Sequence, residues 1–129
     1  MLPATLALSY VLSAGMVAPN GKSWFVKTER FVQGKPFPEI KPALEQHKEW
    51  VAALRENGMA ITSGYRVDET GKPGGGGLMI FAAADHQAAE TFVLDDPLIK
   101  AQCVEYEVNG FICDVGEVDL VDGGAWYAK

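Results

Sequence analysis

The sequence predicts a single α+β domain whose elements follow the order β-α-β-β-α-β. Three observations support this fold class. At 129 residues, the chain has the length of one hydrophobic core. Two segments carry apolar residues at helical spacing, and four others show the alternation or the short apolar run of a strand. Glycine, proline and asparagine separate these segments at short intervals, as they do in turns.

The first half of the domain is predicted to be a strand followed by a long helix. Residues 23–31, SWFVKTERF, alternate as a half-buried strand does. Pro36 and Pro38 delay the start of the helix. From Pro38 to Gly58 the apolar residues recur at helical spacing, and Asn57-Gly58 is a common helix end.

The second half is expected to begin with a β-hairpin. Residues 59–68 and 77–83 have strand patterns, and the continuous apolar run of the second is typical of a central strand. The segment 69–77, ETGKPGGGG, is predicted to be a flexible turn between them, able to act as a lid over a nearby pocket. Because its glycines lead into a strand and not into a helix, they do not predict a phosphate-binding loop.

A second helix, a short helical turn and a last strand complete the order. Asp85 can cap a helix at residues 85–94, and Asp96-Pro97 opens the helical turn. Residues 104–109 alternate as a strand. This is the ferredoxin-like, or split β-α-β, arrangement, in which two helices cover one face of a four-stranded antiparallel sheet.

The sheet face away from the helices is expected to be an interface between two copies of the chain. Trp24, Ile80 or Phe81, and Val104 are the apolar residues that we expect this face to bury. A four-stranded sheet this apolar would otherwise leave a large patch exposed to water. The sequence therefore predicts a homodimer.

Composition and charge exclude several kinds of partner. The 17 acidic and 11 basic residues give a net charge of −6, and no Lys/Arg cluster is dense enough to follow a nucleic-acid backbone. Cys103 and Cys113, the only cysteines, match no zinc-binding pattern and are expected to be free thiols. We expect no nucleic-acid or membrane partner, no metal and no cofactor.

The two ends of the chain differ from the predicted domain at residues 22–120. Residues 1–21 lack charged side chains, and an additional edge strand is the favoured interpretation of this apolar extension. The stretch is also similar to the apolar part of a signal peptide, although it lacks a basic start. We expect a cytoplasmic protein, or a secreted or periplasmic one if residues 1–18 act as a signal. Residues 121–129 are predicted to be a tail.

His47 is the residue that points most directly to function. It occupies the middle of the apolar stripe formed by Ile40, Leu44, Val51 and Leu54, which aims its imidazole at the core or at a cavity beside it. A buried imidazole needs hydrogen-bond partners, and its charge becomes sensitive to its neighbours. The alternative is a core histidine whose hydrogen bonds serve only the fold.

Asp96 and the strand after the long helix supply the other candidate groups. Asp96 precedes a proline, as turn and cap residues often do, but its carboxylate can also orient His47 for acid-base chemistry. Ser63 and Tyr65 project from one side of their strand and can offer hydroxyl groups to a ligand, for which Gly64 leaves room. Packing roles for Ser63 and Tyr65 are the alternative.

Three features occur together and in a fixed order: His47 in the first helix, a strand of small residues at 62–64, and Asp96-Pro97 before the last strand. With these features, the region from residue 24 to about 112 resembles the YCII-related family of small dimeric α+β-barrel proteins. The resemblance implies that the histidine and the aspartate meet in a pocket between helix and sheet as an acid-base pair.

The chain departs from the family pattern at two positions. Members often carry an arginine one helical turn before the histidine, where this chain has Leu44. They often end the small-residue strand with Gly-Pro, where this chain has Gly64-Tyr65. Arg30 and Arg66 are the nearest candidates to bind a substrate anion in place of the missing arginine.

Together these residues predict a small cofactor-independent enzyme of the lyase, isomerase or dehydrohalogenase type. His47 and Asp96 would move a proton on a small cyclic or enolisable compound. The resemblance adds that some relatives eliminate chloride from hydroxylated aromatic compounds. The alternative is a non-catalytic small-molecule-binding or accessory protein of the same fold.

Overall fold

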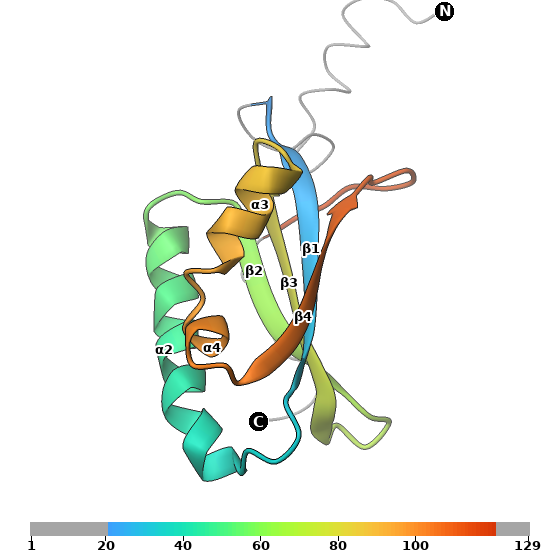
Figure 1. Cartoon of the computed structure of the whole chain (residues 1–129). Helices are drawn as coiled ribbons and strands as arrows, with labels where there is room; N and C mark the ends of the chain where they lie inside the picture. Colours follow the sequence, from blue (N-terminus) through green and yellow to red (C-terminus); the bar gives the residue numbers. More distant parts are fainter. Residues whose placement is uncertain (1–20, 121–129) are drawn as a thin grey trace, which may run out of the picture.

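The structure is a computed structural model, and it describes residues 21–120. Within this range the chain forms four strands and three helices (Figure 1). In chain order they are β1 (Ser23–Phe31), α2 (Phe37–Glu56), β2 (Ile61–Val67), β3 (Pro73–Ala83), α3 (His86–Val93), α4 (Pro97–Lys100) and β4 (Val104–Phe111). The expectations for residues 1–20 and 121–129, an added strand or signal and a tail, lie outside the described residues.

The strands form one antiparallel sheet with the spatial order β2-β3-β1-β4. Figure 1 shows α2, α3 and α4 on one side of this sheet. Central strands β1 and β3, flanked by β2 and β4, are the arrangement of the ferredoxin-like fold, so the predicted fold class is confirmed. The short helix α4 is the predicted helical turn at Asp96-Pro97.

Successive side chains of β1 alternate between the face under the helices and the opposite face of the sheet. Phe25 packs in the core under the helices, and Lys27 reaches Asp96 at the start of α4. Trp24, next to Phe25, therefore points to the opposite face. Pairing with β3 sets Phe81 beside Phe25 on the helix-facing side.

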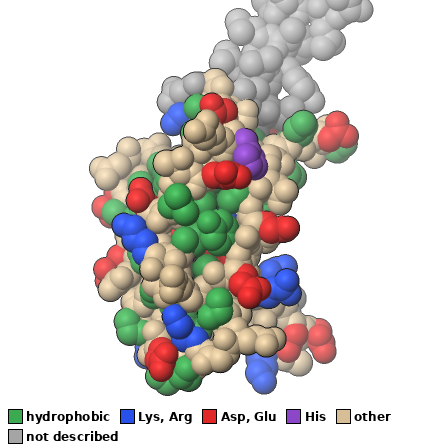
Figure 2. Space-filling model, viewed as in Figure 1, with side chains coloured by type: hydrophobic (Ala, Val, Ile, Leu, Met, Phe, Trp, Pro, Cys, Tyr) green, Lys and Arg blue, Asp and Glu red, His purple; other side chains and the backbone are tan. Residues whose placement is uncertain are grey.

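An apolar core fills most of the space between the sheet and the helices. Hydrophobic side chains also reach the surface, in the middle of the face shown in Figure 2. The main cluster lies under α3 and the second half of α2 and contains Phe25, Val51, Ile61, Met79, Phe81, Ala83, Ala89 and Val93. A smaller one under α4 and the first half of α2 contains Ile40, Ala43, Leu98, Cys103 and Val104.

The glycine-rich segment belongs to strand β3, so the prediction of a flexible turn over residues 69–77 is wrong for its second half. β3 begins at Pro73, and Gly77 lies opposite Tyr65 of β2 and Glu29 of β1. Glycine is a poor strand former by itself. Here Gly77 pairs with both neighbouring strands and Pro73 pairs with Val67 of β2, with a register shift between them.

The turn of the hairpin is correspondingly short. The Asp68 carboxylate closes it by accepting hydrogen bonds from the backbone N–H and hydroxyl of Thr70 and from the backbone N–H of Lys72. These hydrogen bonds lower the pKa of the Asp68 carboxyl, the Thr70 hydroxyl having the largest effect.

Among the residues predicted for a dimer face, Val104 and Phe81, the alternative to Ile80, lie on the helix side instead. Phe81 and Val104 are buried in the two core clusters, because each pairs with a helix-facing residue of β1. Trp24 and Ile80 do lie on the other face. There they pack with the segment 118–120 of the same chain, which covers one end of that face.

Two further properties of the described residues bear on the expectations from composition. Cys103 is buried and Cys113 is partly exposed, and both are free thiols, as predicted. Within residues 21–120, no helix has the length and apolar character that crossing a membrane requires.

Candidate active site

A cavity of about 510 Å³ lies between α2 and the sheet. α2 forms one wall, while β2, the start of β3 and the end of β1 form the other. The walls are mainly apolar, with a few polar groups that include His47, Ser63 and Glu29. This size and composition are typical of sites for small organic ligands.

His47 projects from α2 into the wall of this cavity and is only 6% exposed. It belongs to the buried stripe of the helix, between Ile40 and Val51, as the sequence predicts. Its Nδ1 lies 2.8 Å from Asp96 Oδ1, and its Nε2 lies 2.9 Å from Ser63 Oγ. The fold thus brings three of the predicted site residues together.

Asp96 is fully buried and is held from three sides. Its Oδ1 accepts the backbone N–H of Leu98 at 2.9 Å, which caps α4, and also faces His47. Its Oδ2 accepts from Lys27 Nζ at 2.5 Å. Burial raises the pKa of the Asp96 carboxyl, but the His47 hydrogen bond and the Lys27 charge outweigh burial and hold the pKa below its usual value. Asp96 is therefore negatively charged at neutral pH.

The charge of Asp96 determines which nitrogen of His47 carries the proton. A carboxylate only accepts hydrogen bonds, so the Nδ1–H of His47 donates to Asp96. In the neutral ring Nε2 is then the acceptor, and the Ser63 hydroxyl donates to it. Nε2 is the basic atom of the site.

Lys27 and Glu29 also belong to the site, although the sequence patterns do not single them out. Lys27 Nζ lies 2.5 Å from Asp96 Oδ2 and 2.5 Å from Glu29 Oε1, and the two β1 residues are 1% and 8% exposed. Charged residues that alternate along a strand usually face water. The one signal in the sequence is Phe25, an aromatic residue on the same side of β1.

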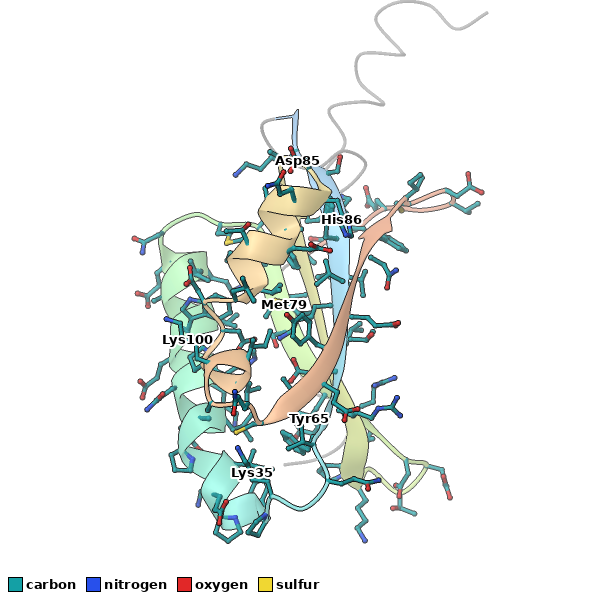
Figure 3. All side chains as sticks on the ribbon, in the orientation of Figure 1. Lys35, Tyr65, Met79, Asp85, His86 and Lys100 are labelled. Carbon is teal, nitrogen blue, oxygen red and sulfur yellow. The ribbon has the colours of Figure 1, made fainter. Side chains whose placement is uncertain are left out.

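Ser63, Gly64 and Tyr65 all line the cavity, where the sequence predicts a binding strand. Tyr65 is 66% exposed, so it lies at the rim. Figure 3 shows Tyr65 toward the end of the sheet opposite His86. His86 is exposed and hydrogen-bonds Glu90 on its own helix, with 2.7 Å between Nε2 and Oε1.

Arg30 and Arg66, the candidates for binding a substrate anion, do not lie among the residues that line this cavity. Arg30 follows Glu29 in β1 and points to the other sheet face, where it lies 3.8 Å from an exposed Glu105 carboxylate. Arg66 follows Tyr65 and donates to the Glu29 backbone oxygen at 3.4 Å. Neither arginine lines the cavity.

Two glycines of β3 allow that strand to pass close to Glu29. A methyl group at Gly77 would lie 2.9 Å from Glu29 Cγ and 3.1 Å from Oε2. Gly76 has a φ of +90°, and a methyl group there would overlap the Glu29 carbonyl oxygen. Gly64 differs, because a methyl group there would meet no atom within 4 Å.

The side chains that meet at this site can donate and accept protons, which suits acid-base chemistry. Among residues 21–120, no group of three or more His, Cys, Asp or Glu side chains is arranged to hold a metal ion. What the described residues do assemble is a hydrogen-bonded chain, Ser63–His47–Asp96, fastened at its far end by Lys27. The fold and the site therefore define a small α+β protein with a buried histidine-carboxylate pair at a ligand-sized cavity.

Comparison with known proteins identifies the family. The sequence pattern of the YCII-related domain matches residues 25–112, most of the chain, so this protein belongs to the YCII-related family. Among solved structures, it is similar to a 5-chloro-2-hydroxyhydroquinone dehydrochlorinase from Burkholderia phenoliruptrix AC1100, determined in complex with 2,5-dihydroxybenzoquinone. The identity is 18%, the match covers 67% of this chain and 90% of that one, and the TM-score is 0.49. No curated protein matches the chain.

Proposed function

We propose that this protein is a cofactor-independent enzyme that moves a proton on a small cyclic or enolisable compound, as lyases, isomerases and dehydrohalogenases do. One observation carries the proposal. His47 presents a basic Nε2 at the wall of a ligand-sized cavity, while a charged, buried Asp96 holds its other nitrogen. This is the arrangement that general-base catalysis requires.

The chemistry follows from the hydrogen bonds. Nε2 takes a proton from the ligand, and Asp96 stabilises the imidazolium that forms, through the Nδ1–H. The Ser63 hydroxyl, released from Nε2, can then donate to the oxygen on which negative charge develops. Returning the proton to another carbon completes an isomerisation. In an elimination, the electron pair from the broken C–H bond forms the new double bond, and the leaving group departs with the electron pair of its own bond to carbon.

The cavity walls support this role. Leu44 and Val51 of α2 and Phe31 of β1 surround the polar groups with apolar side chains. A ligand that fills this space displaces water, and electrostatic interactions with His47 strengthen as water leaves.

The alternative is a protein of the same fold that binds a small molecule without turnover. The hydrogen bond from Ser63 to Nε2 supports it, because both ring nitrogens of His47 are satisfied within the fold. A histidine held in this way also serves structure alone.

Deuterium exchange separates the two. We would incubate the protein in D₂O with a panel of cyclic ketones, lactones and β-chloroketones, following C–H exchange by NMR and chloride release in solution. We expect exchange or elimination on at least one compound, reduced by about 10² to 10⁴ in His47→Gln. His86→Gln, which changes the exposed histidine, is the matched control. Binding without exchange in the wild type would favour the binding protein, and equal rates in both variants would rule out His47 as the base.

We further propose that two copies pair through the sheet face opposite the helices. Leu78 is 38% exposed on that face, and Ile80 beside it is half-buried in the single chain. Pairing would remove this apolar surface from water. Light scattering at micromolar concentration should give twice the chain mass, and Ile80→Lys should give a monomer. A wild-type monomer would contradict the proposal.

A further inference from the structure

Glu29 is a buried carboxylate that acid-base chemistry at His47 does not require. It is 8% exposed and lines the cavity from the sheet side. Its buried Oε1 forms an ion pair with Lys27 Nζ at 2.5 Å and has no hydrogen-bond partner besides this cation among the described residues. A buried carboxylate that shares its one cation with a second carboxylate can accept a further donor.

The charges of Lys27, Glu29 and Asp96 do not cancel among themselves, although a second cation, Arg66, lies at the backbone oxygen of Glu29. Lys27 is a single cation in contact with two carboxylates, Glu29 and Asp96. The three side chains together carry one surplus negative charge when all are ionised. His47 already uses Asp96 as its acceptor. The surplus charge therefore lies on the Glu29 side, next to the cavity.

The second oxygen of Glu29, Oε2, lies next to Gly77 at the cavity wall. Oε2 would lie 3.1 Å from a methyl group at Gly77, and Gly76 and Gly77 both line the cavity. Any side chain at Gly77 would fill the space over the carboxylate. The two glycines thus leave room for Glu29 beside β3 at the cavity wall.

Cationic residues are also present, on the opposite wall. Lys48 and Arg55 belong to α2, and Arg55 donates to the backbone oxygens of Ile61 and Leu120. The cavity therefore has a carboxylate on its sheet side and the Lys48 side chain on its α2 side. A ligand with a hydrogen-bond donor would place that donor against the sheet.

We propose that Glu29 is a specificity-determining residue of this cavity, whose carboxylate binds an O–H or N–H donor of the ligand and rejects analogues that lack it. Lys27, Gly76 and Gly77 are its positioning residues. The inference rests on the proposed use of this cavity as the ligand site, but it does not depend on turnover. A site built around a buried acceptor discriminates strongly against a ligand that leaves the acceptor unpaired.

Three probes of one scaffold test this, measured by NMR titration of the full chain. Benzylammonium and benzyl alcohol carry a donor, while benzyl methyl ether has none, and the apolar walls can take the common ring. We expect the ammonium to bind most tightly and the alcohol about tenfold more tightly than the ether, because hydrogen bonds to a charged acceptor are strong. Shifts should map to residues around the cavity, including Gly77 and Ser63.

Variants assign the preference to its source. In Glu29→Gln the affinity for benzylammonium should fall by about tenfold or more, while the affinity for the ether should change little. The reason is that the substitution removes only the charge-assisted contact. Gly77→Ala should also reduce the preference by displacing the carboxylate. Gly110→Ala is its matched control, since a methyl group there meets no atom within 4 Å.

The preference should persist in His47→Gln, which separates this inference from the acid-base proposal. Failure of deuterium exchange together with an intact donor preference would remove only the acid-base proposal. The assignment of Glu29 is overturned if the ether binds the wild type as tightly as the alcohol. It is also overturned if Glu29→Gln keeps the wild-type order of affinities for the three probes. It is also overturned if His47→Gln abolishes the order or if none of the three probes shifts cavity residues.

Discussion

Two parts of the same layer, between the sheet and the helices, are built in opposite ways. Under α3 the space holds Phe25, Phe81 and Val93, an apolar cluster with no charged member. Only two residues further along β1 from Phe25, Lys27 is buried to the same degree and faces Asp96. The first part gains stability from removing apolar surface from water. The second part holds charges that cost free energy to bury and are retained beside a ligand-sized cavity.

The two parts share one strand, and that strand sets the boundary between them. Phe25 and Lys27 are neighbours on the helix-facing side of β1, so the change from apolar to charged occurs within one repeat of the strand. Four predictions test this contrast, in order of decreasing expected effect.

Phe81→Ala should cause the largest loss of stability. Phe81 is fully buried and stacks near Phe25 with 6.1 Å between ring centroids. Its truncation should lower the free energy of unfolding by about 3–5 kcal/mol, measured by urea denaturation. Phe111→Ala, at a residue 42% exposed, is the control and should cost far less. Equal losses would show that the apolar cluster is not the main source of stability.

Lys27→Met should be nearly as damaging, although a methionine fits the space. It leaves Glu29 and Asp96 buried without their shared cation, and breaking such a pair costs about 3 kcal/mol or more. Adding Glu29→Gln removes one of the stranded charges. The double variant should therefore be more stable than the sum of the two single losses predicts. Additive losses would mean that the two side chains do not interact.

The contribution of Asp96 should depend on pH. Its pKa is lowered by folding, so its charge stabilises the native state above the usual value of 3.8, and this stabilisation is lost as the pH falls through the lower native pKa. In urea denaturation, the wild type should have a larger free energy of unfolding than Asp96→Asn at neutral pH. This difference should narrow below about pH 4.

Asp68→Asn provides the comparison for this pH series. Its pKa is lowered too, by hydrogen bonds in an exposed turn, but solvent screens that carboxylate. We therefore expect a smaller difference in the free energy of unfolding between the wild type and Asp68→Asn. A gap for Asp96→Asn that stays constant down to the lowest pH would contradict the assigned charge.

Gly64→Ala should have the smallest effect. The added methyl group meets no atom within 4 Å, and the lower entropy of the unfolded chain should stabilise the protein by about 0.4–1 kcal/mol. By strand alternation the methyl group points away from the Ser63 side, so probe binding should persist. Weaker binding in this variant would show that the ligand uses the space beside Gly64, as the sequence predicts.

The sequence by itself determined the element order and the centre of the site. Helical spacing placed His47 on the buried stripe of α2, and the Asp-Pro pair placed Asp96 at a helix start. Both signals are local, because they depend only on which residues share one face of one element. The strands were likewise predictable, apart from the glycines of β3, whose low strand propensity hides their pairing.

Only the tertiary structure decided which face of β1 is covered and which charges meet there. Alternation separates Phe25, Lys27 and Glu29 from Trp24 but does not say which set the helices bury. Lys27 and Asp96 are 69 positions apart, and His47 and Asp96 are 49 apart. Contacts across such distances depend on how the elements pack, and burying a lysine is tolerable only where the fold supplies its carboxylates.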